Sequence, residues 1–232
     1  MIPKKIFQSH KSFDYVMDDP ILKQSTFTWK KHYKNYAYSF YDDKRCDTFM
    51  KEHFDGNVYD TYTKMPLPVM NADLWRYCII YHHGGIYADT DLKINTSPDI
   101  FINPNSDISL SVEPNTNFFV QFAFAAIQNS PALKSVIDLV VENMKNYHNG
   151  KMKHLEKEWI VHHLTGPNAF RKGIETYLQK NNLKTFTRNR DYENYYDKRI
   201  YFFPTDDFNY KLTSHFCKGF FDGWRNERDK KM

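Results

Sequence analysis

The sequence predicts an α/β fold in which helices flank a Rossmann-like, mostly parallel central sheet. Short apolar runs alternate with longer amphipathic patterns through the first half of the chain, which is typical of βαβ units. No internal repeat or low-complexity tract interrupts that order. The 232 residues are enough to bury a core without disulfides or a structural metal. We therefore expect one domain over residues 1–232.

Composition excludes several classes of protein. The net charge is +4 and its 32 basic residues are scattered, so we expect no nucleic-acid partner. The three cysteines lie far apart and fit no zinc spacing, which favours a reducing compartment. No apolar leader and no apolar run of about 18 residues occur, so we expect no transmembrane segment and a cytoplasmic location. Aromatic residues reach 17%, which indicates either an aromatic core or a cleft lined by rings.

Periodicity and turn residues predict the elements in order. Ser130 and Pro131 are typical of a helix N-cap and first position, and Asp42 is expected to cap the helix that follows it. Helices are predicted at Asp18–Lys34, Lys44–Phe54, Val69–His83, Ser130–Tyr147, Lys153–Leu164 and Ala169–Gln179. Strands are predicted at Ile2–Phe7, Tyr36–Tyr41, Ile86–Ala88, Leu92–Ile94, Ile108–Val112, Phe118–Ile127, Lys184–Thr187 and Arg199–Phe203, and a loop at Asp55–Pro68.

The segment Gly84–Asp91 is the strongest candidate for a functional site. Two glycines end a helical pattern, a short apolar run follows, and Asp89 and Asp91 stand one residue apart where that strand ends. Side chains of a strand alternate with a period of two, so both carboxylates face the same way or converge on one point. Two anionic oxygens in one place favour Mg²⁺ or Mn²⁺ bound together with substrate phosphates.

Other interpretations of the Asp pair remain. A calcium loop is excluded, because Ile94 stands where that loop needs glycine. An aspartyl-phosphate enzyme would use Asp89 as its nucleophile, although Lys93 replaces the usual hydroxyl residue. A solvated turn with two aspartates is also possible on spacing alone.

Polar residues near this segment have two interpretations each. Asp73 and Arg76 lie three apart, off the apolar stripe of their helix, and form either an ordinary i,i+3 ion pair or part of a polar face that borders the same cleft. Gln121 is the only strongly polar residue of its predicted strand. It is either a satisfied core amide or a group that faces the site.

The segment Asn71–Asp91, with its pattern A-D-x-x-R-Y…G-G-x-Y-x-D-x-D, resembles the signature of the glycosyltransferases with a "sugar-binding region containing DXD motif". That family includes the yeast initiating α-1,6-mannosyltransferases, and the large clostridial glucosylating toxins carry a related segment. The resemblance implies a GT-A type fold, a nucleotide-sugar donor (UDP- or GDP-linked) and a divalent cation, Mn²⁺ or Mg²⁺. Looser similarity at Ile2–Gln8, Phe119–Pro131 and Thr165–Pro167 extends it over most of the chain.

The resemblance also implies roles for single residues. Asp89 and Asp91 would be the catalytic metal-binding pair, Asp89 would also approach the ribose, and His215 would be the third metal ligand. Asp73 and Arg76 would hold the donor sugar and phosphate.

Five further donor-binding residues follow from the same similarity. Backbone at Phe7 and Gln8 would cradle the base, Gly85 and Tyr87 would line the nucleotide pocket, and Trp224 would cover the diphosphate. The family's base-stacking tryptophan is missing from the opening strand, and His10 or Phe13 would take its place.

The expected activity is transfer of a sugar to a glycan or other hydroxyl acceptor, with retention of anomeric configuration. Glu113 and Gln121 are the only candidates for a nucleophile. The alternatives are a metal-dependent phosphotransferase with Asp89 as nucleophile and a non-catalytic nucleotide-sugar-binding module.

Overall fold

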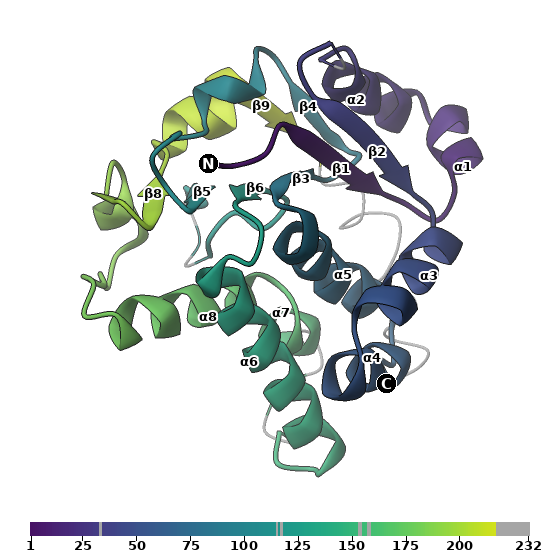
Figure 1. The fold of residues 1–232 in the computed structure, drawn as a ribbon, viewed down its shortest axis with the longest axis vertical. Helices are drawn as coiled ribbons and strands as arrows, with labels where there is room; N and C mark the ends of the chain where they lie inside the picture. Colours follow the sequence, from purple (N-terminus) through teal and green to yellow (C-terminus); the bar gives the residue numbers. More distant parts are fainter. Residues whose placement is uncertain (33, 115, 117, 153–154, 157–158, 217–232) are drawn as a thin grey trace.

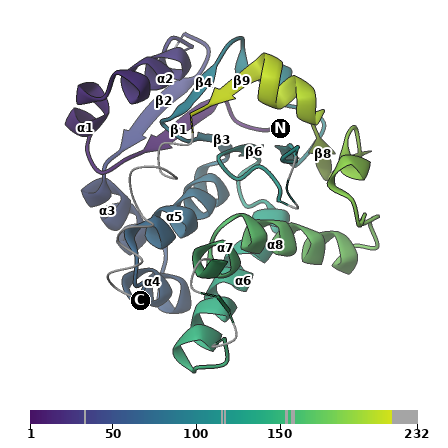
Figure 2. The ribbon, with the colours of Figure 1, turned by 180° about the vertical axis from the view of Figure 1, so that it is seen from behind.

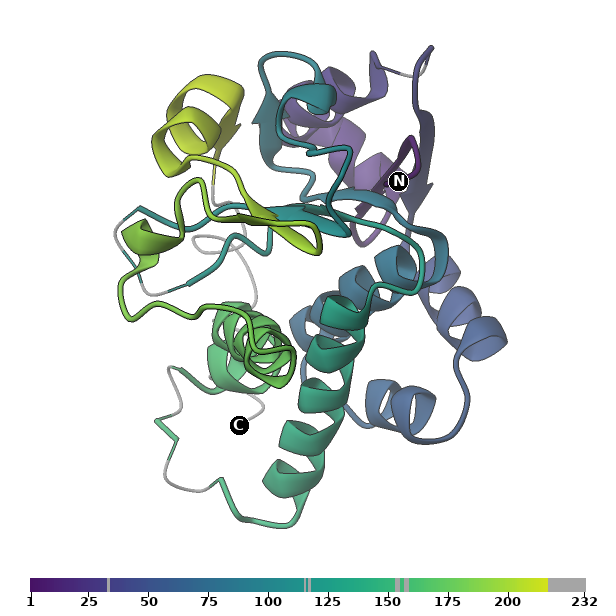
Figure 3. The same cartoon turned by 60° about the vertical axis from the view of Figure 1, so that its left-hand side comes forward.

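The fold has a central sheet between two groups of helices (Figures 1 and 3). It is seen in a computed structural model that describes residues 1–32, 34–114, 116, 118–152, 155–156 and 159–216. In this part of the chain, seven strands form the main sheet in the order β2-β1-β3-β6-β5-β8-β7. These are β1 (Lys5–Ser9), β2 (Ala37–Tyr41), β3 (Gly85–Ala88), β5 (Ile108–Leu110), β6 (Ala123–Ala126), β7 (Tyr196–Asp197) and β8 (Ile200–Phe202).

Strand direction agrees with the predicted mostly parallel sheet. The strands β2, β1 and β3 are parallel to one another, and β5 is parallel to β8. The strand β6 lies antiparallel between β3 and β5, which brings β5 and β8 back into the direction of β3. Because β7 also pairs antiparallel, five strands run one way and two the other.

Helices cover both faces of this sheet (Figures 1 and 2). One side carries α3 (Asp43–His53), α4 (Gly56–Thr63), α5 (Pro68–His83), α6 (Pro131–His148), α7 (Ile160–Leu164) and α8 (Pro167–Lys180). The other side carries α1 (Phe13–Asp18), α2 (Pro20–Lys30) and a π-helical turn at Asp207–Leu212. Short 3-10 turns lie at Pro98–Ile100 and Asn189–Tyr192.

Alternation along the strands separates two apolar cores. Phe7, Tyr87 and Phe124 point toward α5 and α8, whereas their neighbours Ile6 and Ile86 join the core on the side of α2. This is the period of two expected for strands that are buried on both faces. The sheet is therefore rigid on both sides, and the edge where β1 and β3 end is set by this packing.

A second, two-stranded sheet lies beside the main one. The strand β4 (Leu92–Ile94) pairs antiparallel with β9 (Thr213–His215), with Leu92 opposite His215. The strand predicted at Leu92–Ile94 is confirmed, but it pairs with the last described strand of the chain. This pairing brings a residue more than a hundred positions away next to the Asp pair.

The structure corrects several predicted boundaries. The loop predicted at Asp55–Pro68 is wrong, because it contains α4, whose buried Tyr62 donates a hydrogen bond to Asp47 at 2.7 Å. Burial of that ring outweighs the low helix propensity of the glycine and asparagine there. Asp19 caps α2 ahead of Pro20, so the helix predicted at Asp18–Lys34 is shorter, Pro20–Lys30, and the separate helix α1 before it was not predicted.

Other predicted segments are shorter or absent. The strand predicted at Lys184–Thr187 does not form, and Phe186 packs edge-on against Tyr192 with ring centroids 4.9 Å apart. Only Ala123–Ala126 of the predicted strand Phe118–Ile127 is in the sheet. Of the predicted helix Lys153–Leu164, the described residues are α-helical at Ile160–Leu164.

Among the described helices, none combines the length and the apolar character that crossing a membrane requires.

Candidate active site

The candidate site lies at the sheet edge where β1 and β3 end, because parallel neighbouring strands finish on the same side. Gln8 of β1 is fully buried, and its amide donates a hydrogen bond to the backbone oxygen of Asp89 at 3.1 Å. Tyr38 of β2 donates to the other end of that amide at 3.0 Å. Both ends of the Gln8 side chain are thus bound, and the predicted donor-binding residue positions the backbone of the Asp pair.

Two glycines join α5 to β3 without a loop. Gly84 caps α5 with φ of 62°, and Gly85 follows with φ of 114°, a region that favours glycine. A Cβ at Gly85 would lie 2.7 Å from the backbone oxygen of Lys5. Because Gly85 can approach β1 this closely, α5 passes directly into β3. The polar face of α5 consequently lies beside the carboxylate that follows the strand.

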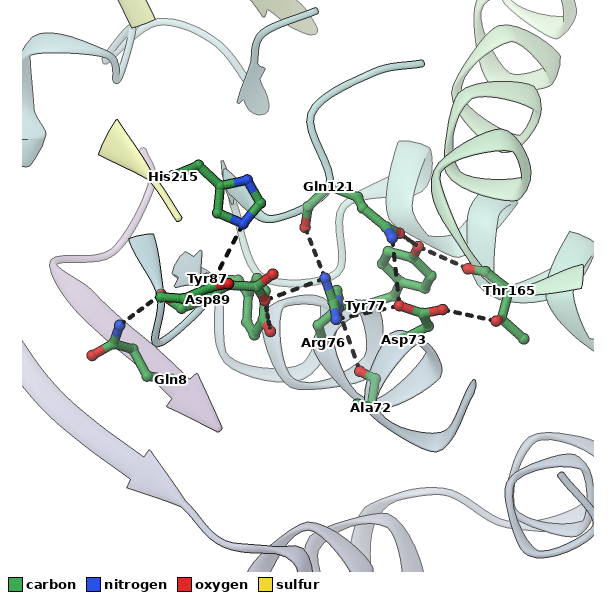
Figure 4. A network of polar contacts seen from close by, with 11 residues as sticks. Gln8, Ala72, Asp73, Arg76, Tyr77, Tyr87, Asp89, Gln121, Thr165 and His215 are labelled. Carbon is green, nitrogen blue, oxygen red and sulfur yellow. Dashed lines mark hydrogen bonds and ion pairs between the residues drawn. The ribbon is translucent and has the colours of Figure 1, made fainter. Parts of the chain in front are cut away.

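Arg76 connects the two halves of the site (Figure 4). Its guanidinium lies 3.2 Å from a carboxylate oxygen of Asp73 and 3.4 Å from one of Asp89. It also lies over the ring of Tyr87, 4.8 Å from the centroid. Arg76 is only 7% exposed and Asp73 only 2%. The two residues form the i,i+3 ion pair that their spacing predicts, and the pair is buried beside Asp89.

Asp73 is held by three elements. Thr165, which follows α7, donates to it at 2.8 Å, and the amide of Gln121 lies 3.5 Å from its other oxygen. Tyr77 donates to the backbone oxygen of Thr165 at 2.9 Å and also contacts the amide oxygen of Gln121. Burial raises the pKa of Asp73 to about 6, although Arg76 opposes the shift. The carboxylate is therefore fixed in place and costly to ionise.

Asp89, Asp91 and His215 form a group that could hold a metal ion. Their ligand atoms all lie within 4.8 Å of one another, and the imidazole of His215 is 3.3 Å from the Asp91 carboxylate. The pairing of β4 with β9 brings His215 here, and Phe122 stacks on its ring at 4.0 Å. Tyr87 donates a hydrogen bond to the Asp89 carboxylate. Burial raises the pKa of Asp89, against the influence of Arg76.

The donor set fits a hard or borderline divalent cation. Two carboxylates and one imidazole suit Mn²⁺ or Mg²⁺ better than a soft, thiolate-binding metal. Asp73, Asp89 and Asp91 bring three carboxylates to this network, and the guanidinium of Arg76, which contacts Asp73 and Asp89, brings one positive charge. Ionised, they leave two negative charges, which a divalent cation would neutralise.

The remaining predicted residues have varied positions. The ring of Phe7 points away from this edge and stacks on His83, with centroids 5.6 Å apart. His10, a candidate base platform, stacks on Tyr15 at 4.7 Å just beyond β1. Trp224 lies outside the described residues.

The two candidate nucleophiles differ in their surroundings. The side chain of Gln121 faces the site through its contacts with Asp73 and Tyr77. Glu113 is partly buried after β5, accepts a hydrogen bond from Thr116 at 2.9 Å, and has its pKa raised by burial. Only Gln121 contacts the network around Asp73.

Sequence reasoning missed Thr165, Tyr77 and Tyr38 as members of the site. Thr165 is 92 positions from Asp73, and no local pattern indicates their contact. The signal at this position was the looser family similarity of Thr165–Pro167, which indicated no partner.

Comparisons with known proteins find similarity to glycosyltransferases. Residues 21–108 match the family described as "Glycosyltransferase sugar-binding region containing DXD motif". The "Initiation-specific alpha-1,6-mannosyltransferase" of Schizosaccharomyces pombe is 27% identical over 198 residues, covering 76% of this chain and 49% of that protein. The "Mannosyl phosphorylinositol ceramide synthase CSH1" of Saccharomyces cerevisiae is 34% identical over 91 residues, covering 39% of this chain and 23% of the relative.

The fold agrees with that class. The solved structure titled "PaToxG Glycosyltransferase" superposes with a TM-score of 0.52 at 19% identity, covering 77% of this chain and 70% of that one. The predicted GT-A type α/β fold is confirmed. Residues 21–108 of the chain therefore match the DXD sugar-binding region of this family, as the resemblance predicted. The chain spans about half the length of the S. pombe relative, 49%.

Proposed function

We propose that this chain binds a nucleoside diphosphate sugar together with Mn²⁺ or Mg²⁺ and transfers the sugar to a hydroxyl group of an acceptor. The observation that carries the proposal is the order of groups along the network in Figure 4. Gln8 lies at one end, the Asp89–His215 group comes next, then Arg76, and Asp73 with Thr165 lies at the other end. A nucleotide sugar has the same order of nucleoside, diphosphate and sugar.

Each group has a role in this proposal. Asp89, Asp91 and His215 hold the cation, which neutralises the diphosphate when it is bound. Arg76 donates to phosphate or sugar oxygens with a planar fork that lysine lacks. Asp73 accepts from sugar hydroxyls in its ionised form. Trp224 covering the diphosphate stays part of the proposal.

The leaving group gives the guanidinium of Arg76 a role in the reaction. Breaking the bond between the anomeric carbon and the phosphate oxygen leaves the electron pair on the nucleoside diphosphate. The guanidinium of Arg76, held rigidly by two carboxylates, stabilises that developing charge without reorganising. Burial of Arg76 strengthens the interaction, because water screens it less.

Retention of configuration and a UDP- or GDP-linked donor belong to the same proposal. The S. pombe relative is named as an alpha-1,6-mannosyltransferase, so a mannosyl donor is the first to test, with a glucosyl donor second. Formation of an α-linkage from an α-linked nucleotide sugar retains the configuration. Proton NMR of the product's anomeric signal reports which anomer forms first.

The test is a donor hydrolysis screen over UDP- and GDP-sugars with and without Mn²⁺, combined with calorimetric titration of the donor. We expect metal-dependent binding and hydrolysis, and loss of both in Asp91→Asn. The matched control is Asp107→Asn, a partly buried aspartate that precedes β5 at the opposite end of the sheet. Donor binding that survives without metal and in Asp91→Asn contradicts the proposal.

The two alternatives give different results in the same screen. A phosphotransferase would accumulate a phosphoaspartate at Asp89, detectable by mass spectrometry after borohydride reduction. In the structure the Asp89 carboxylate is already bound by Arg76 and Tyr87, which opposes that role. A binding module would bind donor tightly and release no nucleoside diphosphate, even to water.

A further inference from the structure

Three aromatic side chains form a cluster beside the site that the network above does not include. Phe118 and His162 stack with ring centroids 5.5 Å apart and planes 9° apart. Trp159, directly before α7, packs on His162 at 5.2 Å and is 41% exposed. We call Phe118, Trp159 and His162 the aromatic platform.

The platform is built on fixed backbone. The backbone oxygen of Phe118 accepts a hydrogen bond from the amide of Glu113 at 3.1 Å, which closes the turn after β5. Residues 160–164 form α7, and Ile160, Val161 and Leu164 are buried against their neighbours. The hydrogen bond fixes the backbone that carries Phe118, and the packing of α7 fixes the backbone that carries His162.

The platform adjoins the sugar end of the network. His162 precedes Thr165 by three residues, about 4.5 Å along a helix axis, and Thr165 binds Asp73. Phe118 precedes Gln121 by three residues, and Gln121 contacts the same carboxylate. In Figure 4 Thr165 lies at the opposite end from Gln8 and His215. A ligand on the platform would thus be next to the sugar and far from the nucleoside.

We propose that the aromatic platform of Phe118, Trp159 and His162 binds a pyranose ring of a glycan acceptor. This inference rests on the proposed function, because it takes the Asp73 end of the network as the place of the donor sugar. The apolar C–H face of a pyranose packs on an aromatic ring, whose face carries partial negative charge. Ring hydroxyls at the rim would then point toward Thr165 and the donor.

Binding is tested without donor. Saturation-transfer difference NMR with methyl α-mannopyranoside and methyl α-glucopyranoside detects contact with protein protons, and glycerol serves as a polyol without a ring face. We expect Trp159→Ala to lose the saturation-transfer signal, because the dissociation constant for the glycoside rises about tenfold or more. Trp159→Phe keeps a ring and should recover most of the binding.

Two further variants separate the platform from general effects on folding. Phe118→Leu keeps apolar volume and removes a ring, and should also weaken glycoside binding. Phe27→Ala, at an aromatic residue of α2 that is 44% exposed, is the matched control and should bind as the wild type does. Equal glycoside binding by the wild type, Trp159→Ala and Phe118→Leu would overturn the platform.

Turnover separates this inference from the proposed function. With donor, Mn²⁺ and a methyl glycoside, we expect the ratio of transfer to donor hydrolysis to fall about tenfold in Trp159→Ala. Donor hydrolysis with a ratio that does not depend on Trp159 keeps the proposed function and overturns the platform. Glycoside binding through Trp159 without any donor hydrolysis supports the platform and counts against the proposed function.

Discussion

Arg76 connects the carboxylate of Asp73 on α5 with the carboxylate of Asp89 after β3. It contacts carboxylates on its own helix and after the next strand, while the ring of Tyr87 covers its face. Removal of the guanidinium would leave these carboxylates without their cationic partner, which is costly for the buried Asp73. The orientation of Asp89 depends on Tyr87 in the same way, through one hydrogen bond.

Tyr87→Phe tests that orientation. The variant keeps the ring over Arg76 and removes only the hydroxyl that binds Asp89. Loss of a group that orients a metal ligand typically weakens metal affinity by 10- to 100-fold, and we expect about tenfold for Mn²⁺ by calorimetry. Tyr36→Phe is the control, because it removes a comparable hydrogen bond, from Tyr36 to Asp99 at 2.6 Å, that does not belong to the site. Equal Mn²⁺ affinity in both variants would contradict the role of Tyr87.

The protonation of Asp73 predicts a pH dependence of stability. Burial raises its pKa from 3.8 to about 6, so between these values the folded protein holds a proton that the unfolded chain has lost. Its contribution to stability therefore decreases as pH rises through this window, by at most about 1.4 kcal/mol per pH unit.

Urea denaturation of wild type and Asp73→Asn at pH 4 and pH 6.5 measures this contribution, because the amide does not titrate. We expect the difference in free energy of unfolding to shift against the wild type as pH rises. Parallel curves for wild type and Asp73→Asn would show that Asp73 does not retain its proton on folding.

At the scale of elements, the direct passage from α5 into β3 decides where the site lies. Gly84 and Gly85 have positive φ, and each would bring an added Cβ within 3 Å of other atoms. The sequence predicted this helix and strand and their connection correctly, because local signals specify them. It missed α4 and the short length of β6, because both depend on packing against other parts of the chain.

Gly85→Ala tests the connection. Its φ of 114° and a Cβ contact of 2.7 Å with the backbone of Lys5 combine strain with overpacking. We expect a loss of about 3 kcal/mol or more in the free energy of unfolding, measured in urea. Gly56→Ala also has positive φ, 50°, but meets nothing within 4 Å, and should lose only about 1–2 kcal/mol. Similar losses in the two variants would show that the close approach to β1 is unimportant.

At the scale of the whole molecule, the candidate metal group joins distant parts of the chain. Asp89 and Asp91 follow β3, and His215 arrives on β9, the last described strand. A cation bound by all three is bound only by the folded arrangement, so it stabilises that arrangement by mass action. Its charge also offsets the two negative charges left by the carboxylates and Arg76.

Metal removal should therefore lower stability. At a Mn²⁺ concentration about 100 times the dissociation constant, we expect about 2.7 kcal/mol of stabilisation, or about 5–10 °C in the midpoint of thermal unfolding. A chelator should reverse the shift, and Asp91→Asn should abolish it while Asp107→Asn retains it. A midpoint that is independent of Mn²⁺ in the wild type argues against the cation site.

The sequence by itself determined the helix with Asp73 and Arg76, the two glycines, the following strand and the Asp pair. These groups lie within about twenty consecutive positions, and periodicity and turn chemistry act over such distances. The tertiary structure alone decided that Thr165 and Gln121 hold Asp73, that Gln8 and Tyr38 fix the backbone of Asp89, and that β9 pairs with β4. Contacts between such distant residues arise from burial and strand pairing, for which a single sequence carries no local signal.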